Sequence, residues 1–166
     1  MVLSMGLVLA IIGVIMLLTW RPNPDPVREV DIGQALAAAQ ADASFEPLVP
    51  ALQDLRATSA RWQVTEASEG VRVWHVGYVT PDEEYLQVSQ AEIAGPNYIS
   101  EQTLDGVAVE TVTVDGTDWQ IYEAPNRISV VSTADGVTTI VGGSGSVDSV
   151  LTAAGSLIPG GLTTEQ

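Results

Sequence analysis

His75 is the only histidine of this 166-residue chain, and imidazole is the side chain best suited to proton transfer near neutral pH. It lies in the string Trp74-His75-Val76-Gly77-Tyr78, whose alternation predicts a strand that is largely apolar on both faces. A catalytic histidine also needs a nucleophile and an orienting partner. Because no second histidine exists to share a metal ion, we interpret His75 as a structural core residue.

Two further stretches contain residue types that bind ligands. The acidic run Asp82-Glu83-Glu84 lacks the alternating oxygen ligands and the turn glycine of a calcium loop, so we interpret it as a solvated hairpin tip. Residues 142–146 (GGSGS) match neither a nucleophile elbow nor a phosphate loop, and they predict a connection to a helix with Ser146 as N-cap. We therefore expect no catalytic residue, no metal site and no cofactor.

Aromatic side chains are the remaining candidates for a binding site. Such residues either fill a core or line an apolar pocket between a sheet and its helices, and the sequence does not separate these uses. We favour the core. The four candidate residues, all in strand patterns, are Trp62, Trp74, Tyr78 and Trp119.

The charge balance excludes several classes of partner. The chain has 21 acidic residues against six arginines, with no lysine, and its formal net charge is −15. Nucleic acid is not expected as a partner, because binding it requires cations that neutralise phosphates. The absence of cysteine excludes disulfides and thiolate chemistry.

Residues 1–20 are predicted to form a transmembrane helix. Residues 2–20 contain neither charge nor proline, and as a helix they would span roughly 28 Å, about one hydrocarbon core. A cleaved signal peptide would have a basic start and small residues before its cleavage site, and this segment has neither. We therefore expect an uncleaved anchor in the lipid bilayer, with Trp20 at the interface.

The charged residues after the predicted helix give conflicting indications of the side of the membrane on which the domain lies. Arg21 and Arg28 follow the predicted helix, so the positive-inside rule read literally places the domain in the cytoplasm. Asp25, Glu29 and Asp31 lie in the same flank and weaken that count. We prefer a single-pass protein of the plasma membrane with its C-terminal domain outside the cytoplasm.

The rest of the chain is predicted to form one domain on a short tether. Residues 21–30 are a proline-rich linker, residues 31–158 an α+β domain, and residues 159–166 a disordered tail. Helices are expected at residues 32–43, from Gly95-Pro96 onward, and at 147–158. Period-2 patterns predict strands at residues 56–65, 71–80, 85–91, 107–114, 117–123, 127–133 and 137–141.

Short connections between these segments favour an antiparallel β-sheet of about seven strands with helices packed on one face. Asp115-Gly116 and Asp135-Gly136 are dipeptides typical of tight hairpins, and they are the strongest turn signals of the chain. Asp31 is the expected N-cap of the first helix of the domain.

Several strings are similar to a known family. Residues 56–62 (RATSARW), 74–81 (WHVGYVTP), 101–103 (EQT) and 136–139 (GVTT) resemble an actinobacterial family of single-pass membrane proteins, domain of unknown function 4245. The resemblance extends over nearly the whole chain. It implies an N-terminal anchor with the domain outside the cytoplasm, and it brings no activity, catalytic residue or cofactor.

These observations favour a protein that is not an enzyme. Our leading hypothesis is a membrane-anchored envelope protein that is an accessory or interaction subunit of a complex with other membrane or envelope proteins. The alternative is a carrier or sensor domain that holds an apolar ligand or lipid between sheet and helices. Enzymatic activity ranks third, because the scattered carboxylates show no recognisable spacing.

Overall fold

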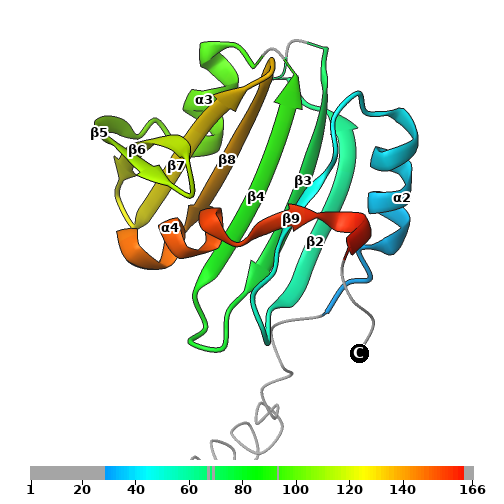
Figure 1. Ribbon diagram of the computed structural model, residues 1–166, viewed down its shortest axis with the longest axis horizontal. Coiled ribbons are helices and arrows are strands. Elements are labelled where there is room, and N and C mark those ends of the chain that lie inside the picture. Colours follow the sequence, from blue (N-terminus) through cyan, green and yellow to red (C-terminus); the bar gives the residue numbers. More distant parts are fainter. Residues whose placement is uncertain (1–28, 67, 69, 93, 163–166) are drawn as a thin grey trace, which may run out of the picture.

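The computed structural model describes residues 29–162, except residues 67, 69 and 93 (Figure 1). The predicted transmembrane helix, most of the predicted linker and residues 163–166 lie outside the described residues. Within the described part of the chain, no helix has the length and apolar character needed to cross a membrane.

A seven-stranded antiparallel sheet forms the centre of the domain, as the sequence predicts (Figure 1). Its spatial order is β2-β3-β4-β8-β7-β6-β5. After β4 the chain crosses to the far edge of the sheet, where it forms β5. Strands β6, β7 and β8 then follow back toward the centre, and β8 pairs with β4. The strands are β2 (Arg56–Val64), β3 (Arg72–Val79), β4 (Tyr85–Glu92), β5 (Val107–Val114), β6 (Thr117–Ala124), β7 (Arg127–Ala134) and β8 (Val137–Gly143).

Both Asp-Gly dipeptides form the predicted hairpin turns. Asp115 and Gly116 have φ of 50° and 82°, and Asp135 and Gly136 have φ of 51° and 80°. Two successive positive φ values give a turn whose twist matches that of the flanking strands. These turns set the registers of β5 with β6 and of β7 with β8.

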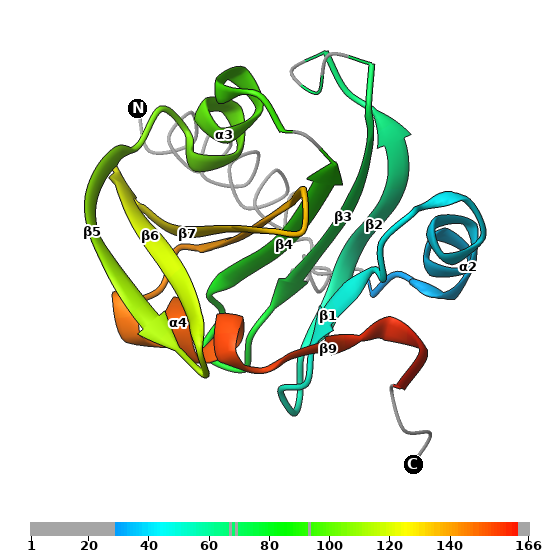
Figure 2. The ribbon, with the colours of Figure 1, turned by 45° about the horizontal axis from the view of Figure 1, so that its top comes forward.

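Helices cover both faces of the sheet, so the prediction of helices on one face is wrong. Helix α4 (Val147–Gly155) packs on one face through Val150 and Ala153, and α3 (Pro96–Thr103) packs on the other through Tyr98. Figure 2 shows the two helices on opposite sides of β7 and β8. The physical reason is that the central strands are apolar on both faces, and each face must be removed from water.

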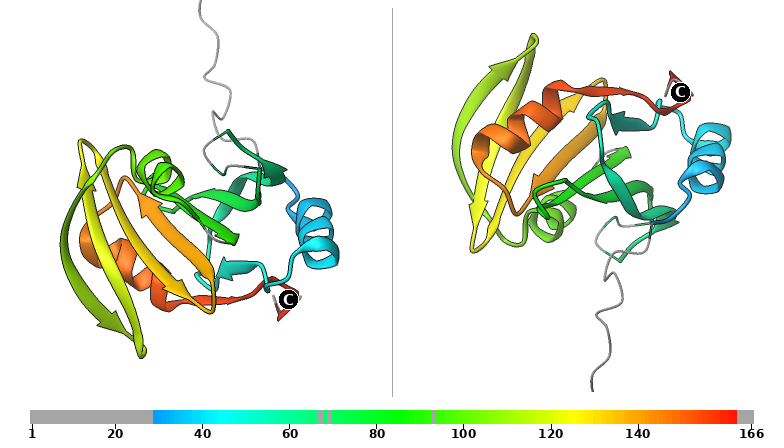
Figure 3. Two further views of the ribbon diagram at one scale, coloured as in Figure 1. Left: turned by 90° about the horizontal axis from the view of Figure 1, so that it is seen from above. Right: turned by 90° about the horizontal axis from the view of Figure 1, so that it is seen from below.

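Helix α2 (Gly33–Asp42) lies beside β2 at one end of the sheet (Figure 3). Its N-cap residue is Ile32 and not Asp31 as predicted. The Asp31 side chain still contributes to the helix start, because its Oδ1 accepts a hydrogen bond from the Gly33 amide at 2.8 Å. The observed helix is one residue shorter than the prediction at each end.

A second, two-stranded sheet was not predicted. Strand β1 (Leu48–Pro50) pairs with β9 (Leu157–Pro159), which continues into the 3-10 helix η1 (Gly160–Leu162). The last helix was predicted to include Leu157 and Ile158, but it ends at Gly155, a residue with low helix propensity. Pro159 to Leu162, placed in the tail by the sequence prediction, therefore have regular structure.

Candidate functional site

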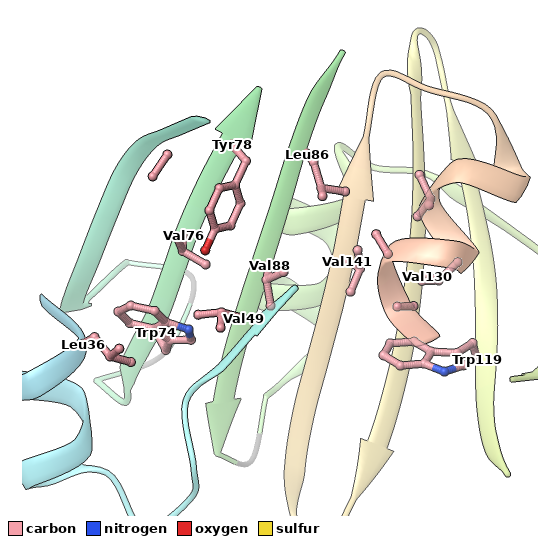
Figure 4. Close-up of a cluster of buried hydrophobic side chains, with 14 of the residues drawn as sticks. Leu36, Val49, Trp74, Val76, Tyr78, Leu86, Val88, Trp119, Val130 and Val141 are labelled. Atoms are coloured by element: carbon pink, nitrogen blue, oxygen red, sulfur yellow. The ribbon is translucent and has the colours of Figure 1, made fainter. Parts of the chain in front are cut away.

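Trp74 and Tyr78 fill the core between the sheet and the β1–β9 pair (Figure 4). Trp74 is fully buried, and its indole N–H donates to the Leu48 carbonyl oxygen at 2.9 Å. Burial raises the pKa of Tyr78 to about 12, so its hydroxyl stays protonated at physiological pH. For these two residues the structure agrees with the core interpretation.

Trp62 joins β2 to the end of α2. It is half-buried, and its indole N–H donates to Asp42 Oδ2 at 3.0 Å. Its ring also meets Phe45 edge-to-face, with centroids 6.0 Å apart. Asp42 in turn forms an exposed ion pair with Arg72 at 3.1 Å, so this cluster fixes the helix against the sheet.

Trp119 lies in the core and also on the wall of a cavity of about 520 Å³. This volume falls in the range of small-ligand sites, about 300–1,000 Å³. The cavity is open to solvent on one side and is bordered by the end of α4, the β1–β9 pair and the tips of both Asp-Gly hairpins. Its apolar lining includes Phe45, Leu48, Val114, Trp119, Val137 and Leu157.

The edge of the sheet at β5 is open. Strand β5 pairs with β6 on one side, and no described strand pairs with its other side. Five large apolar side chains in the described residues are exposed, and three of them lie on or just before this strand: Val107 and Val109 on β5, and Leu104 in the connection from α3 to β5. We call these three residues the β5 apolar edge. The opposite edge is covered, because α2 packs beside β2 and the Val30 amide donates to the Ala57 carbonyl oxygen at 2.8 Å.

His75 is half-buried and borders a second cavity, on the α3 face. Burial and, to a smaller extent, the positive charges of Arg61 and Arg127 together lower its pKa from 6.5 to about 4. The imidazole is therefore neutral at physiological pH. The neighbouring Ser89 hydroxyl hydrogen-bonds to Tyr98 at 2.5 Å, so it is not paired with His75 as a nucleophile would be.

The acidic run and residues 142–146, which were not predicted as binding sites, lie in a turn and before a helix. Glu83 has a φ of 61° and lies in the turn between β3 and β4. Ser146 is the N-cap of α4, as predicted, and its Oγ accepts a hydrogen bond from the Ser149 amide at 3.2 Å. Across the described residues, no group of three or more histidine and acidic side chains is placed to hold a metal ion.

Sequence reasoning missed three residues that line cavities. Phe45 was placed in a connecting segment, and it borders the cavity of Trp119. Arg61 and Arg127 border the cavity of His75. The scarcity of arginine was the available signal, because the chain has only six cationic residues.

The fold defines a small α+β domain built on an antiparallel sheet. This chain belongs to the family Protein of unknown function (DUF4245), which matches residues 1–157. Among curated proteins, none matches the sequence. This match confirms the resemblance to the family, and the family description assigns no function.

Proposed function

We propose that this chain is a non-catalytic, single-pass envelope protein that acts as an accessory or interaction subunit of a membrane protein complex. In this proposal residues 1–20 anchor it in the plasma membrane of an actinobacterium, and the domain lies outside the cytoplasm. The observation that carries the proposal is the β5 apolar edge, because its side chains are exposed to solvent beside a strand edge that no described strand pairs with.

An unpaired strand offers free backbone N–H and C=O groups to another chain, and natural proteins usually protect such edges. This domain protects its β2 edge with α2 and with the Val30–Ala57 hydrogen bond. Within the described part of the chain, the protection at β5 is limited to a bulge between Ala108 and Thr111, where the Gln120 side chain donates to the Glu110 carbonyl oxygen at 2.9 Å. The asymmetry between the two edges favours a partner at β5.

The charge around the β5 apolar edge indicates the chemistry of that partner. Asp105, Glu110 and Glu123 are exposed beside the three apolar side chains. The whole chain has a net charge of −15, so the field at this edge is negative. The partner is therefore a protein that presents an extended segment with apolar residues and flanking lysine or arginine side chains.

Site-specific photo-crosslinking in intact cells tests this proposal. A photoreactive phenylalanine replaces Val109 in the full-length chain, and the matched control carries it at Val64 on β2. The two side chains are similarly exposed, at 55% and 50%. The proposal expects one defined crosslinked partner from position 109 and none from position 64. Identical patterns at both positions, or a protein that crosslinks to nothing and migrates alone in mild detergent, would refute it.

The cavity of about 520 Å³ beside Trp119 favours a second candidate function, a carrier or sensor of an apolar ligand. Ala134 lies exposed at this cavity, so Ala134→Trp would fill it without disturbing the core. Thr133→Trp, on an exposed residue outside the lining, is the control. A lipid that copurifies with the wild-type chain and the control, and not with Ala134→Trp, would support this candidate. Equal lipid content in all three proteins would eliminate it.

A further inference from the structure

The cavity beside His75 has a different character from the one beside Trp119. It lies on the α3 face of the sheet and has a volume of about 400 Å³. We call it the arginine cavity. The polar side chains that matter for its chemistry are Arg61, His75, Gln87, Glu101, Gln102 and Arg127.

Strand register brings these groups together from distant parts of the chain. Arg61 on β2 is the direct cross-strand partner of His75 on β3. Gln87 on β4 pairs with Gly77 on one side and with Gly142 on the other. Because glycine has no side chain, Ser59 and Tyr85 pack over position 77 and Arg127 packs over position 142.

Arg127 lies over Gly142. Its Nη2 donates to Gln87 Oε1 at 3.2 Å and its Nε donates to Ser129 Oγ at 3.3 Å. A Cβ atom at position 142 would lie 2.5 Å from Arg127 Nη2, so glycine is required there for the guanidinium to take this position. Burial lowers the pKa of Arg127, which shows that its charge has lost part of its hydration.

The two guanidiniums are not neutralised by the described part of the protein. Neither Arg61 nor Arg127 forms an ion pair with a carboxylate in the described residues. Glu101 also lines the cavity, but it is exposed and its Oε1 accepts a hydrogen bond from Gln102 Nε2 at 3.0 Å. Two cations that border one cavity, with no carboxylate of the described residues paired to either of them, favour an anionic ligand there.

The imidazole of His75, which borders the same cavity, has a ring nitrogen that lacks a hydrogen-bond partner among the described residues. This nitrogen, Nε2, is buried. Buried polar atoms are nearly always paired, so an unpaired one beside a cavity marks a place for a ligand atom. The neutral imidazole can offer its N–H to an oxygen at this point.

We propose that the arginine cavity binds a small ligand through a phosphate or carboxylate group, with the guanidiniums of Arg61 and Arg127 as the charge partners and His75 Nε2 as a hydrogen-bond donor. Guanidinium groups suit both oxyanions because their N–H groups match the oxygen spacing. The exposed Glu101 then lies at the mouth, where it would repel ligands of high negative charge and favour those with a single anionic group.

The single histidine gives a direct test, because one imidazole signal reports on the cavity. Full-length protein with ¹³C-labelled histidine and a tag free of histidine is placed in phosphatidylcholine nanodiscs and titrated with inorganic phosphate or acetate at constant ionic strength. The proposal expects a saturable shift of the imidazole signal and a rise in the pKa of His75 of at least about one unit, since an anion offsets the repulsion from both arginines.

A second set of nanodiscs contains phosphatidylglycerol and no added anion. A shift in these nanodiscs alone assigns the site to a lipid headgroup phosphate. A shift with the dissolved anions assigns it to a free ligand. No saturable shift in either set overturns the proposal.

Variants separate specific binding from a general salt effect. Arg61→Gln removes a charge from an exposed side chain and should weaken anion binding about tenfold or more, because hydrogen bonds to charged groups are the strong ones. Arg127→Gln should abolish the shift, with folding checked by circular dichroism. The matched control is Arg72→Gln, which removes the same charge outside the cavity and should bind as the wild type does. Equal weakening by Arg61→Gln and Arg72→Gln would overturn the proposal.

Discussion

The buried state of His75 makes the stability of this domain depend on pH. Burial and the two nearby guanidiniums lower its pKa from 6.5 to about 4 in the folded protein. Between these values the unfolded chain binds a proton that the folded protein does not bind. The stabilisation from keeping this imidazole neutral is therefore fully present above pH 6.5 and is lost as the pH falls toward 4.

The size of the stability change follows from the difference between the pKa values of His75 in the unfolded and folded states. One pH unit of differential protonation corresponds to about 1.4 kcal/mol, so lowering the pH from about 8 to about 5 should remove about 2 kcal/mol of unfolding free energy through His75 alone. Carboxylates elsewhere also titrate on acidification. Their effect cancels when the wild type is compared with His75→Gln, which has a polar side chain that does not titrate.

Urea unfolding of the full-length protein in detergent micelles, followed by tryptophan fluorescence, measures this difference. The wild type should lose stability relative to His75→Gln as the pH falls, and the difference should grow steadily below pH 6.5. If the two proteins show parallel stability profiles from about pH 8 to about pH 5, His75 titrates as an ordinary exposed histidine and the description of the arginine cavity as desolvated is wrong.

Three further substitutions test the local structure by chemical or thermal unfolding. Tyr98→Phe removes the hydroxyl that pairs with Ser89 at 2.5 Å and leaves a buried serine unpaired, so it should cost about 1–2 kcal/mol; unchanged stability would show that Ser89 finds another partner. Gly136→Ala places a side chain at a φ of 80°, where a Cβ would meet nothing within 4 Å, so its expected loss of about 1–2 kcal/mol of unfolding free energy is purely conformational. Gly136→Asn should lose less, because asparagine tolerates positive φ. Ser146→Ala removes the N-cap of α4 and should cost about 1 kcal/mol, whereas Ser146→Gly should cost only a few tenths; equal losses would argue against a capping role.

The strands and hairpins were predictable because their signals are local. Alternating residues set the seven strands to within about two residues, and the Asp-Gly dipeptides supplied the positive φ values of two turns. The apolar stripe of α4 was likewise visible in the spacing of Val147, Val150, Leu151 and Ala154, which pack against the core. Each of these features depends on residues close together in the chain.

The features that were missed depend on pairing between distant residues. Strand β1 has three residues, which are too few to show the alternating pattern of a strand. Its partner β9 directly follows α4, and the apolar spacing of that helix continues through Ile158, so β9 was predicted as part of the helix. The apolar second face of the central strands was noted, yet the short helix α3 was not recognised as its cover. The sequence does not predict the arginine cavity. Arg127 on β7 contacts Gln87 on β4, and these two strands are brought near each other only because β8 pairs between them.

The β1–β9 pair has a consequence for how the chain folds during synthesis. Leu48 is hydrogen-bonded through its amide to Gln90 and through its carbonyl oxygen to Trp74, but the strand to which it belongs is completed by pairing with residues 157–159. The ribosome makes these residues well after residue 92, where β4 ends, so the segments of β2, β3 and β4 are synthesised before the β1–β9 pair can cover Trp74. Such late, long-range closure slows folding and leaves apolar surface exposed in the meantime. Closure of the β1–β9 pair is therefore a late step in the folding of this domain.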